Sequence, residues 1–425
     1  MRGVRGRIIG LLARLRFGRS RAGGSTDALL SMLPESALVP LQRDGLDPVP
    51  ELGRLRAEEP VSRLKLPFGL RAWIVTGYEE SKAVLGASAA FSNDFTNLVG
   101  TVGITADQNP GGLGFTDPPD HTRLRKLLTP EFTGHRLRRL GPRIDAIVAG
   151  QLDEMETTAR AGAQVDLVQQ FALPIPSLTI CELLGVPYAD RADFQRLSTT
   201  RFDLLGGVTG SLGAISQSME YLLDIVKKQR AEPGEGLLGQ LVRNHGDALS
   251  DHELAGLADG LLTGGLETTA SMLALGTIVL LGHPETRAAV RDDPAAVDPF
   301  VDELLRYLTV VQVAFPRFAR ERVTIGGQVI EQGDIVLCSL SGANRDGGQE
   351  TFDPARAARP HLAFGFGLHR CIGAELARME LRTAYPALLR RFPDISLATG
   401  PGELPYRKLS FVFGVDALPV TLGNV

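Results

Sequence analysis

The stretch 364–378, FGFGLHRCIGAELAR, places one cysteine in a glycine-rich turn directly before a predicted helix. Gly365 and Gly367 permit a tight backbone turn in which side chains would clash. Cys371 then lies near the first backbone N–H groups of the helix, where the positive end of the helix dipole stabilises a thiolate. A thiolate at such a turn is a suitable ligand for a soft or redox-active metal. The usual alternative, a small buried cysteine, is disfavoured by the glycine turn and the flanking cations.

The chain as a whole has the composition of an ordinary globular protein. Of its 425 residues, 44% are hydrophobic and 22% are charged, which excludes a disordered or collagen-like chain. The formal net charge of -4 argues against a nucleic-acid partner. Three cysteines cannot form a disulfide framework, so a reducing, cytoplasmic location is expected.

Hydrophobic periodicity predicts a mainly helical chain with small β-sheets, an α+β fold built as one unit over residues 26–425. The expected elements are a β-hairpin at 61–76, a helix at 78–85, a long loop at 91–115, helices through most of 120–282, a helix at 301–308 and short strands after it.

Residues 1–25 are predicted to be a basic tail outside this unit. The first 24 carry seven arginines and no acid, and Ile8, Leu11, Leu12 and Leu15 have helical spacing. One interpretation is a helix on an anionic membrane surface. A flexible tail or a gene start placed too early is favoured over it, and the apolar run is too short to span a bilayer.

Several common catalytic motifs are absent from the sequence. No Gly-Lys dipeptide exists, which excludes a P-loop, and there is no HExxH, GxSxG or CxxC pattern. Kinases, simple hydrolases and zinc enzymes therefore lose most of their support.

A long apolar helix is predicted at 254–281, and it contains the string GGLETT at 264–269. Glycines inside a helix each cost roughly 1 kcal/mol relative to alanine, so something must approach the backbone closely there. The carboxyl of Glu267 and the hydroxyl of Thr268 form a pair that can relay protons. Taken alone, the segment is interpreted as a structural buried helix, and its polar positions argue against a membrane span.

The segment around Cys371 resembles the haem-binding loop of the cytochrome P-450 family, the haem-thiolate monooxygenases, whose pattern F-G-x-G-x-H-x-C-x-G is complete here. The resemblance covers roughly residues 26–425 and implies a single fold with haem b between the long central helix and the cysteine loop. It implies that Cys371 is the axial thiolate ligand of the iron and that Phe364 packs beside the sulfur. Gly373 and the backbone N–H groups after the turn would tune the sulfur.

The GGLETT string is similar to the family's oxygen-activating helix, [AG]-G-x-[DE]-T. This similarity implies that Glu267 and Thr268 deliver protons while dioxygen, the co-substrate, is activated. It also implies that Gly264 and Gly265 make room for the haem and oxygen.

Other motifs point to the haem propionates and to a structural brace. DPPDHTRLR at 117–125 resembles the family segment whose histidine and arginine bind a propionate, which implies this role for His121 and Arg125. Arg317 and His369 are further propionate candidates. Taken alone, the first segment is an ordinary solvated basic face.

Glu303 and Arg306 resemble the family's E-x-x-R pair, which braces the segment before the cysteine loop. Arg359 is the expected third partner and Arg356 its competitor. Taken alone, E-x-x-R is most often a solvated ion pair.

The family forms its substrate pocket from regions that are apolar in this chain, so an apolar, medium-sized organic substrate is expected. Phe95, Phe315 and Phe411 are the candidate substrate contacts, with ordinary core packing as the alternative for each.

The resemblance implies a monomeric monooxygenase for hydroxylation or epoxidation, with electrons from NAD(P)H through a ferredoxin and a ferredoxin reductase. An acidic ferredoxin suits a basic patch at Arg370, Arg378 and Arg382, unless these arginines pair internally. The alternatives are a haem-thiolate enzyme for oxidative coupling or nitric-oxide reduction and, from another class, a non-catalytic haem-binding sensor.

Overall fold

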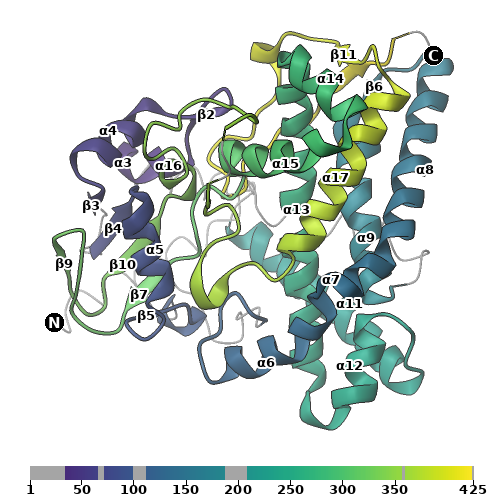
Figure 1. The fold of residues 1–425 in the computed structure, drawn as a ribbon. Helices are drawn as coiled ribbons and strands as arrows, with labels where there is room; N and C mark the ends of the chain where they lie inside the picture. The colour runs from purple at the N-terminus through teal and green to yellow at the C-terminus, as the bar shows by residue number, and fades with distance from the viewer. Residues whose placement is uncertain (1–33, 66–70, 99–111, 187–207, 357–358, 424–425) are drawn as a thin grey trace, which may run out of the picture.

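The computed structural model describes residues 34–65, 71–98, 112–186, 208–356 and 359–423, except for the side chains of Lys65, Phe95, Leu98 and 208–218. Figure 1 shows a large helical part and, beside it, a smaller part with short strands. The predicted fold class, mainly α with small sheets, is confirmed. The basic tail at 1–25 lies outside the described residues.

The longer helices are α6 (Asp120–Leu128), α8 (Gly141–Arg160), α9 (Pro174–Leu184), α11 (Val208–Ala231), α12 (Leu237–His245), α13 (Asp251–Gly282), α14 (Pro284–Asp292), α15 (Pro294–Leu308) and α17 (Ala374–Arg391). Two further helices of nine residues are α4 (Pro50–Glu58) and α5 (Tyr78–Gly86). The short helices are α3 (Glu35–Leu38), α7 (Gly134–Leu137) and α16 (Leu340–Ala343).

The longest of these helices, α13, runs through the middle of the helical part (Figure 1). It begins with a capping box in which the Ser250 hydroxyl accepts from the Glu253 N–H and the Glu253 carboxylate accepts from the Ser250 N–H. Helices α9, α11 and α17 pack around it. Within the described ranges it alone has the length and composition to cross a membrane. However, 78% of its most apolar 18-residue stretch is buried inside the protein, as in a core helix.

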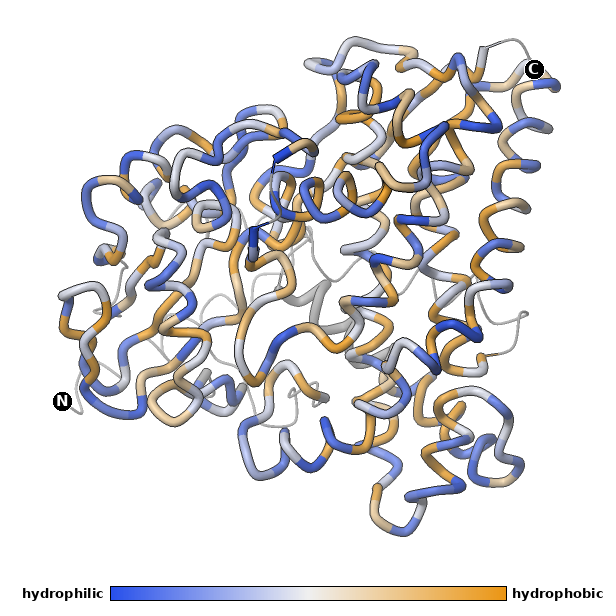
Figure 2. The backbone as a smooth tube through the Cα atoms, in the orientation of Figure 1, coloured by the Kyte–Doolittle hydropathy of each residue, from blue (hydrophilic) through white to orange (hydrophobic). Residues whose placement is uncertain are grey.

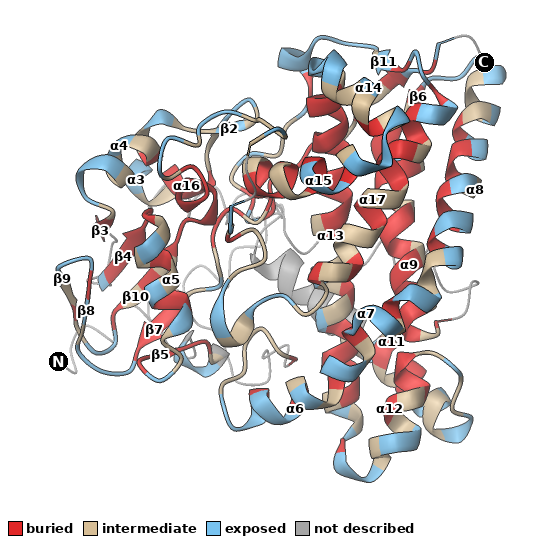
Figure 3. Cartoon of the chain, viewed as in Figure 1, coloured by how far each residue is buried: buried red, intermediate tan, exposed pale blue. Residues whose placement is uncertain are grey.

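Helix α8 lies at the outer edge of the helical part and shows why these sequences form helices. Figure 2 shows hydrophilic and hydrophobic residues alternating along it, and Figure 3 shows its exposed positions on the outer side. The buried positions recur every three or four residues, which directs one apolar face toward the core. They are Ile144, Ile147, Val148, Gln151, Leu152 and Met155.

The main sheet has five strands in the order β3-β4-β10-β7-β5. Their bounds are β3 Val61–Lys65, β4 Arg71–Val75, β10 Ile335–Cys338, β7 Arg317–Ala319 and β5 Phe91–Ser92. Strands β4 and β10 pair parallel, and the other neighbours pair antiparallel. The smaller sheets pair β6 (Val165–Asp166) and β11 (Ser396–Leu397) with β12 (Pro419–Thr421), β8 (Val323–Ile325) with β9 (Gln328–Ile330), and β1 (Arg43–Asp44) with β2 (Asp47–Pro48).

Most of the predicted elements are confirmed, with two corrections. The hairpin at 61–76 is β3 and β4, the helix at 78–85 is α5, and short strands follow α15. The helix predicted at 301–308 begins earlier, because the Asp293 carboxylate accepts from the Ala295 N–H and caps it. The prediction of a loop throughout 91–115 is wrong at its start, where Phe91 pairs with Ala319; residues 99–111 lie outside the described part.

Candidate active site

The cysteine loop is a sharp turn held by glycines and by backbone hydrogen bonds. Gly365 and Gly367 have φ values of 68° and 71°, in the left-handed region that favours glycine. A Cβ atom at Gly367 would lie 2.6 Å from the Leu85 carbonyl oxygen, so no side chain fits there. The Cys371 N–H donates to the Phe364 carbonyl at 2.9 Å. This turn fixes Cys371 three residues before the start of α17.

The surroundings of Cys371 place positive charge near its sulfur. The residue is exposed to the space in front of the loop, but neighbouring protein atoms desolvate the sulfur and raise the pKa of the thiol. The Gly373 N–H, which donates to the sulfur, and the guanidiniums of Arg125, Arg370 and Arg378 act in the opposite direction. A metal that binds here must displace the thiol proton, and these groups would stabilise the resulting thiolate.

Two histidines predicted as propionate ligands lie together. The ring centroids of His121 and His369 are 4.3 Å apart. His121 is fully buried, and within the described residues neither of its ring nitrogens has a hydrogen-bond partner. The His369 Nδ1 lies 3.2 Å from the Leu113 carbonyl oxygen. Burial lowers the pKa of both imidazoles, to about 4 for His369, where His121 and Arg317 add to the effect.

Arginines complete this cluster. Arg317 is buried, and its Nη1 donates to the Phe315 carbonyl at 2.8 Å. Burial lowers the pKa of Arg317 and of Arg125, which also interacts with Cys371. Buried nitrogens favour binding of an anion when they have too few hydrogen-bond partners in the protein. The residues present therefore fit the carboxylates of a haem beside the cysteine sulfur.

Helix α13 is open at the predicted oxygen-activating string. Gly264 is exposed although most of the helix is buried, and no other heavy atom would lie within 4 Å of a Cβ placed there. The Thr268 hydroxyl donates to the Gly264 carbonyl at 2.6 Å, a bond that can bend a helix. The structure thus brings Gly264 and Thr268 to one open stretch.

Gly265 lies at a packing contact between two helices. A Cβ atom at this position would lie 2.7 Å from the Ile180 Cδ1 of helix α9. Gly265 therefore allows the close packing of α9 against α13, and its predicted role beside the haem stays a prediction.

Glu267 has a partner that the sequence did not indicate. Its carboxylate is buried and forms an ion pair with Arg407, whose Nε also donates to Asp416 at 2.7 Å. The other carboxylate oxygen, Oε2, is buried with no hydrogen-bond partner in the described residues. A buried carboxylate requires a cation, but nothing in the sequence identified Arg407 as that cation.

The Glu303 and Arg306 pair is buried, and it is not the solvated pair that the motif alone favours. The side chains keep only 10% and 4% of their exposed area. Arg306 donates to the carbonyls of Asn344, Gln349 and Thr351 at 2.7–3.0 Å. The pair therefore ties α15 to the chain segment that leads to the cysteine loop.

Arg356, the competitor, joins this network in place of Arg359. Its Nη2 donates at 3.2 Å to the same Thr351 carbonyl that accepts from Arg306. Arg359 is exposed. The preference for Arg359 as the third partner is therefore wrong.

Two of the three predicted substrate contacts are exposed aromatic side chains. Phe315 and Phe411 are 50% and 41% exposed, and the Phe315 ring lies 4.6 Å from that of Phe115. Large apolar side chains of this kind are available to a ligand. Phe95 begins a short 3-10 helix, η3 (Phe95–Leu98), but its side chain lies outside the described part.

Two arginines of the predicted basic patch pair internally. Arg378 forms an ion pair with Asp302 and lies over the Phe364 ring, and Arg382 pairs with Asp298 and Glu375. Arg370 stays exposed. The patch predicted from these three arginines is therefore reduced to one.

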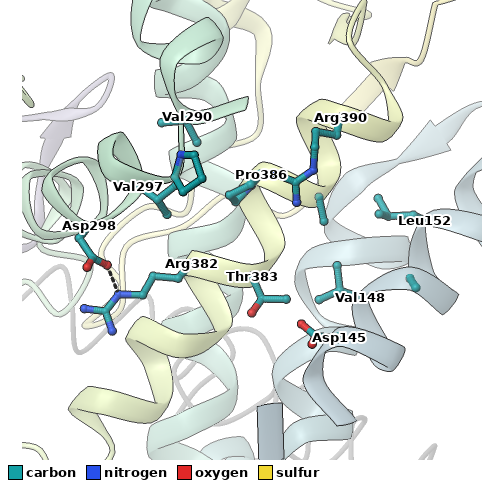
Figure 4. Close-up of a pocket in the computed structure, with 13 residues that line it drawn as sticks. Asp145, Val148, Leu152, Val290, Val297, Asp298, Arg382, Thr383, Pro386 and Arg390 are labelled. Carbon is teal, nitrogen blue, oxygen red and sulfur yellow. Dashed lines mark ion pairs between the residues drawn. The ribbon is translucent and has the colours of Figure 1, made fainter. Parts of the chain in front are cut away.

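A surface groove between α8, α14–α15 and α17 is lined by Val148, Leu152, Val290, Val297 and Pro386, with Arg382 and Asp298 paired at its rim (Figure 4). None of the predicted site residues lines it. The groove is therefore separate from the candidate active site.

Comparison with known proteins identifies the family. The family model for cytochrome P450 matches residues 59–232 and 226–412. Cytochrome P450 FAS1 of Rhodococcoides fascians is 40% identical over 90% of this chain and 97% of its own length. Cytochrome P450 monooxygenase PikC of Streptomyces venezuelae is 41% identical over 88% and 91%.

The fold agrees with this. The crystal structure of OxyC, a cytochrome P450 implicated in an oxidative C–C coupling reaction during vancomycin biosynthesis, superposes with a TM-score of 0.80. The match has 38% sequence identity and covers 91% of this chain and 97% of OxyC. With the cysteine loop and the matched family model, these relatives show that the chain belongs to the cytochrome P450 family of haem-dependent monooxygenases.

Proposed function

We propose that this enzyme inserts one atom of dioxygen into a C–H or C=C bond of an apolar organic substrate. The observation that carries the proposal is the open stretch of α13, where Gly264 is exposed and the Thr268 hydroxyl bonds to its carbonyl beside the buried carboxylate of Glu267. A hydroxyl next to a carboxylate at an accessible position can pass protons to a bound reactant.

Haem b is the cofactor of the family, and it supplies an iron at which dioxygen, the co-substrate, is activated. In this chain Cys371 would ligate the iron through its sulfur, and the Gly373 N–H already donates to that sulfur. His121, Arg125, Arg317 and His369 would hold the carboxylates, since their nitrogens lie desolvated around the cysteine loop.

The remaining residues set access and orientation. Phe315 and Phe411 offer apolar surface to a substrate and exclude water from it. Thr268 and Glu267 would relay the protons that oxygen chemistry consumes, with the Thr268 side chain half-buried and that of Glu267 buried. We propose a cytoplasmic location because all three cysteines are free.

Electrons are proposed to come from NAD(P)H through a ferredoxin reductase and a small acidic ferredoxin. Exposed cations gather on α6, on the turn Arg138–Leu140 and on the start of α8: Lys126, Arg138, Arg139 and Arg143. Arg370 adds to them from the cysteine loop, and no acidic side chain in the described ranges is ion-paired with these five. This surface replaces the patch first expected at Arg378 and Arg382, and its charge favours an acidic partner.

A second candidate is oxidative coupling of a substrate without oxygen insertion. It is favoured by the similarity to OxyC, which is implicated in such a reaction. The non-catalytic sensor loses its support, because the chain belongs to a family of monooxygenases.

Isotopically labelled dioxygen distinguishes the two candidates. A substrate is first found by the shift in the haem absorption spectrum that it causes, and it is then turned over with ferredoxin, reductase and NAD(P)H. Incorporation of one labelled atom into the product supports the monooxygenase. A coupled product without the label would support the second candidate, and neither product with any substrate that shifts the spectrum would contradict both.

A further inference from the structure

The buried acid of α13 is tied to the C-terminal segment 404–416, which also carries Phe411. Glu267 pairs with Arg407 from this segment, and Arg407 donates to Asp416 as well. The two carboxylates differ sharply in burial: the side chain of Glu267 is 2% exposed and that of Asp416 is 66% exposed. Arg407 therefore pairs with two carboxylates, that of Glu267, which is shielded from water, and that of Asp416, which is solvated.

The backbone of this segment fixes Arg407 against α13. The Arg407 N–H donates to the Gly414 carbonyl at 2.9 Å, and Tyr406 pairs with Val415, so the two sides form a hairpin. A Cβ atom at Gly414 would lie 2.7 Å from the Ser271 hydroxyl. The hairpin backbone thus lies directly on α13, four residues from Glu267 along the helix.

The far side of the hairpin is fixed to the segment after α15. The Gln312 N–H donates to the Phe411 carbonyl at 3.0 Å, and the Phe413 N–H donates to the Val310 carbonyl at 2.7 Å. Arg407 is therefore held by backbone bonds on an element that also carries the exposed Phe411.

We infer that Arg407 is a positioning residue for proton delivery: it keeps the buried Glu267 carboxylate ionised and fixed in place, with the Oε2 atom left to exchange protons. This inference rests on the proposed role of Glu267. An ionised carboxylate in a desolvated site needs a cationic partner. Without Arg407, Glu267 takes up a proton and its carboxyl no longer acts as a proton acceptor.

The first test compares Arg407→Gln with Asp416→Asn, which removes only the exposed partner. Infrared spectra of the intact holoenzyme at neutral pH report a protonated carboxyl through its C=O absorption. Glu380 is buried and its pKa is raised to about 8, so the wild type already has one such band. An additional band is expected in Arg407→Gln and absent from Asp416→Asn and from the double variant Arg407→Gln/Glu267→Gln. The same additional band in Asp416→Asn, or its absence from Arg407→Gln, contradicts the inference.

The second readout is the partition of reducing equivalents between product and hydrogen peroxide. Loss of a positioned acid or base typically costs 10²–10⁴-fold in rate, so product per NAD(P)H in Arg407→Gln should fall by about tenfold or more. Arg407→Lys keeps the positive charge and should recover most of the product formed per NAD(P)H. A purely structural arginine would lower thermal stability and leave both the partition and the infrared band unchanged.

Two comparisons keep the inference separate from the function on which it rests. If Glu267→Gln leaves the partition unchanged, the proposed role of Glu267 is wrong. If Glu267→Gln uncouples the enzyme and Arg407→Gln does not, the role of Arg407 is wrong. Should Arg407→Gln fail to fold, the double variant is compared with Glu267→Gln: equal partition supports the inference, and a further loss contradicts it.

Discussion

The imidazole rings of His121 and His369 lie with their centroids 4.3 Å apart, one on α6 and the other in the cysteine loop. Burial lowers the pKa of both, so each is neutral in the folded protein at neutral pH. Two neutral rings with desolvated nitrogens are ready to donate to a carboxylate, which links the haem site to a measurable pH dependence.

His369 should make the stability of the haem-free protein depend on pH. Its pKa is about 4 in the folded chain and about 6.5 in the unfolded chain. The unfolded state therefore binds more protons between these values, and stability is lost as the pH falls through this window, by about 3 kcal/mol at most. His369→Gln should flatten this loss in urea unfolding measured across the window. The exposed His135→Gln serves as the control; parallel curves for wild type and His369→Gln would count against the assignment.

Gly264 and Gly265 should respond in opposite ways to alanine. Gly264→Ala meets open space, so helix propensity should stabilise the haem-free protein by up to about 1 kcal/mol. In the holoenzyme the added methyl group should lower haem retention or substrate binding. Gly265→Ala collides with Ile180, and this overpacking should cost about 1–3 kcal/mol. Combining Gly265→Ala with Ile180→Ala should relieve the collision. Equal changes in the free energy of unfolding for Gly264→Ala and Gly265→Ala would contradict this difference between the two glycines.

The Glu303 and Arg306 pair should contribute far more to stability than a surface pair. Removing one member of a buried pair leaves an uncompensated charge, so Arg306→Ala should cost about 3–5 kcal/mol. Arg54 and Glu51 are a matched surface pair, and Arg54→Ala should cost at most about 1 kcal/mol. Denaturant unfolding of the two variants measures both; similar losses would mean that the E-x-x-R pair is not a brace.

Thr268→Ala should separate electron uptake from product formation. The variant keeps the cysteine loop and should accept electrons normally, but it loses the hydroxyl at the open stretch of α13. Peroxide should rise at the expense of product, while Thr268→Ser should resemble the wild type. Unchanged yields of both product and peroxide in Thr268→Ala would remove the proposed role of this hydroxyl.

The sequence predicted those parts of the site that are encoded locally. The turn around Cys371 needs glycines within a few residues, and both have the expected positive φ. The long helix with Glu267 and Thr268 and the hairpin at 61–76 also follow from short-range periodicity. In each case the residues that determine the structure are close together in the chain.

The features that sequence reasoning missed depend on contacts between distant segments. Glu267 pairs with Arg407, 140 positions further on, and nothing in the string around Arg407 distinguishes it from a surface arginine. Gly265 packs closely against Ile180 of another helix. The choice between Arg356 and Arg359 depended on which side chain reaches the Thr351 carbonyl. Periodicity shows which face of an element is apolar, but it does not identify the partner.

The most direct test of the account is a carbon-monoxide difference spectrum of the dithionite-reduced protein. Ligation of the haem iron by the Cys371 sulfur predicts the strongly red-shifted Soret band of a thiolate ligand, and Cys371→Ser should abolish it. Cys338 is buried, and Cys338→Ser should retain the band. A band at the position of a histidine-ligated haem, or a red-shifted band that survives in Cys371→Ser, would contradict the assignment of Cys371 as the ligand.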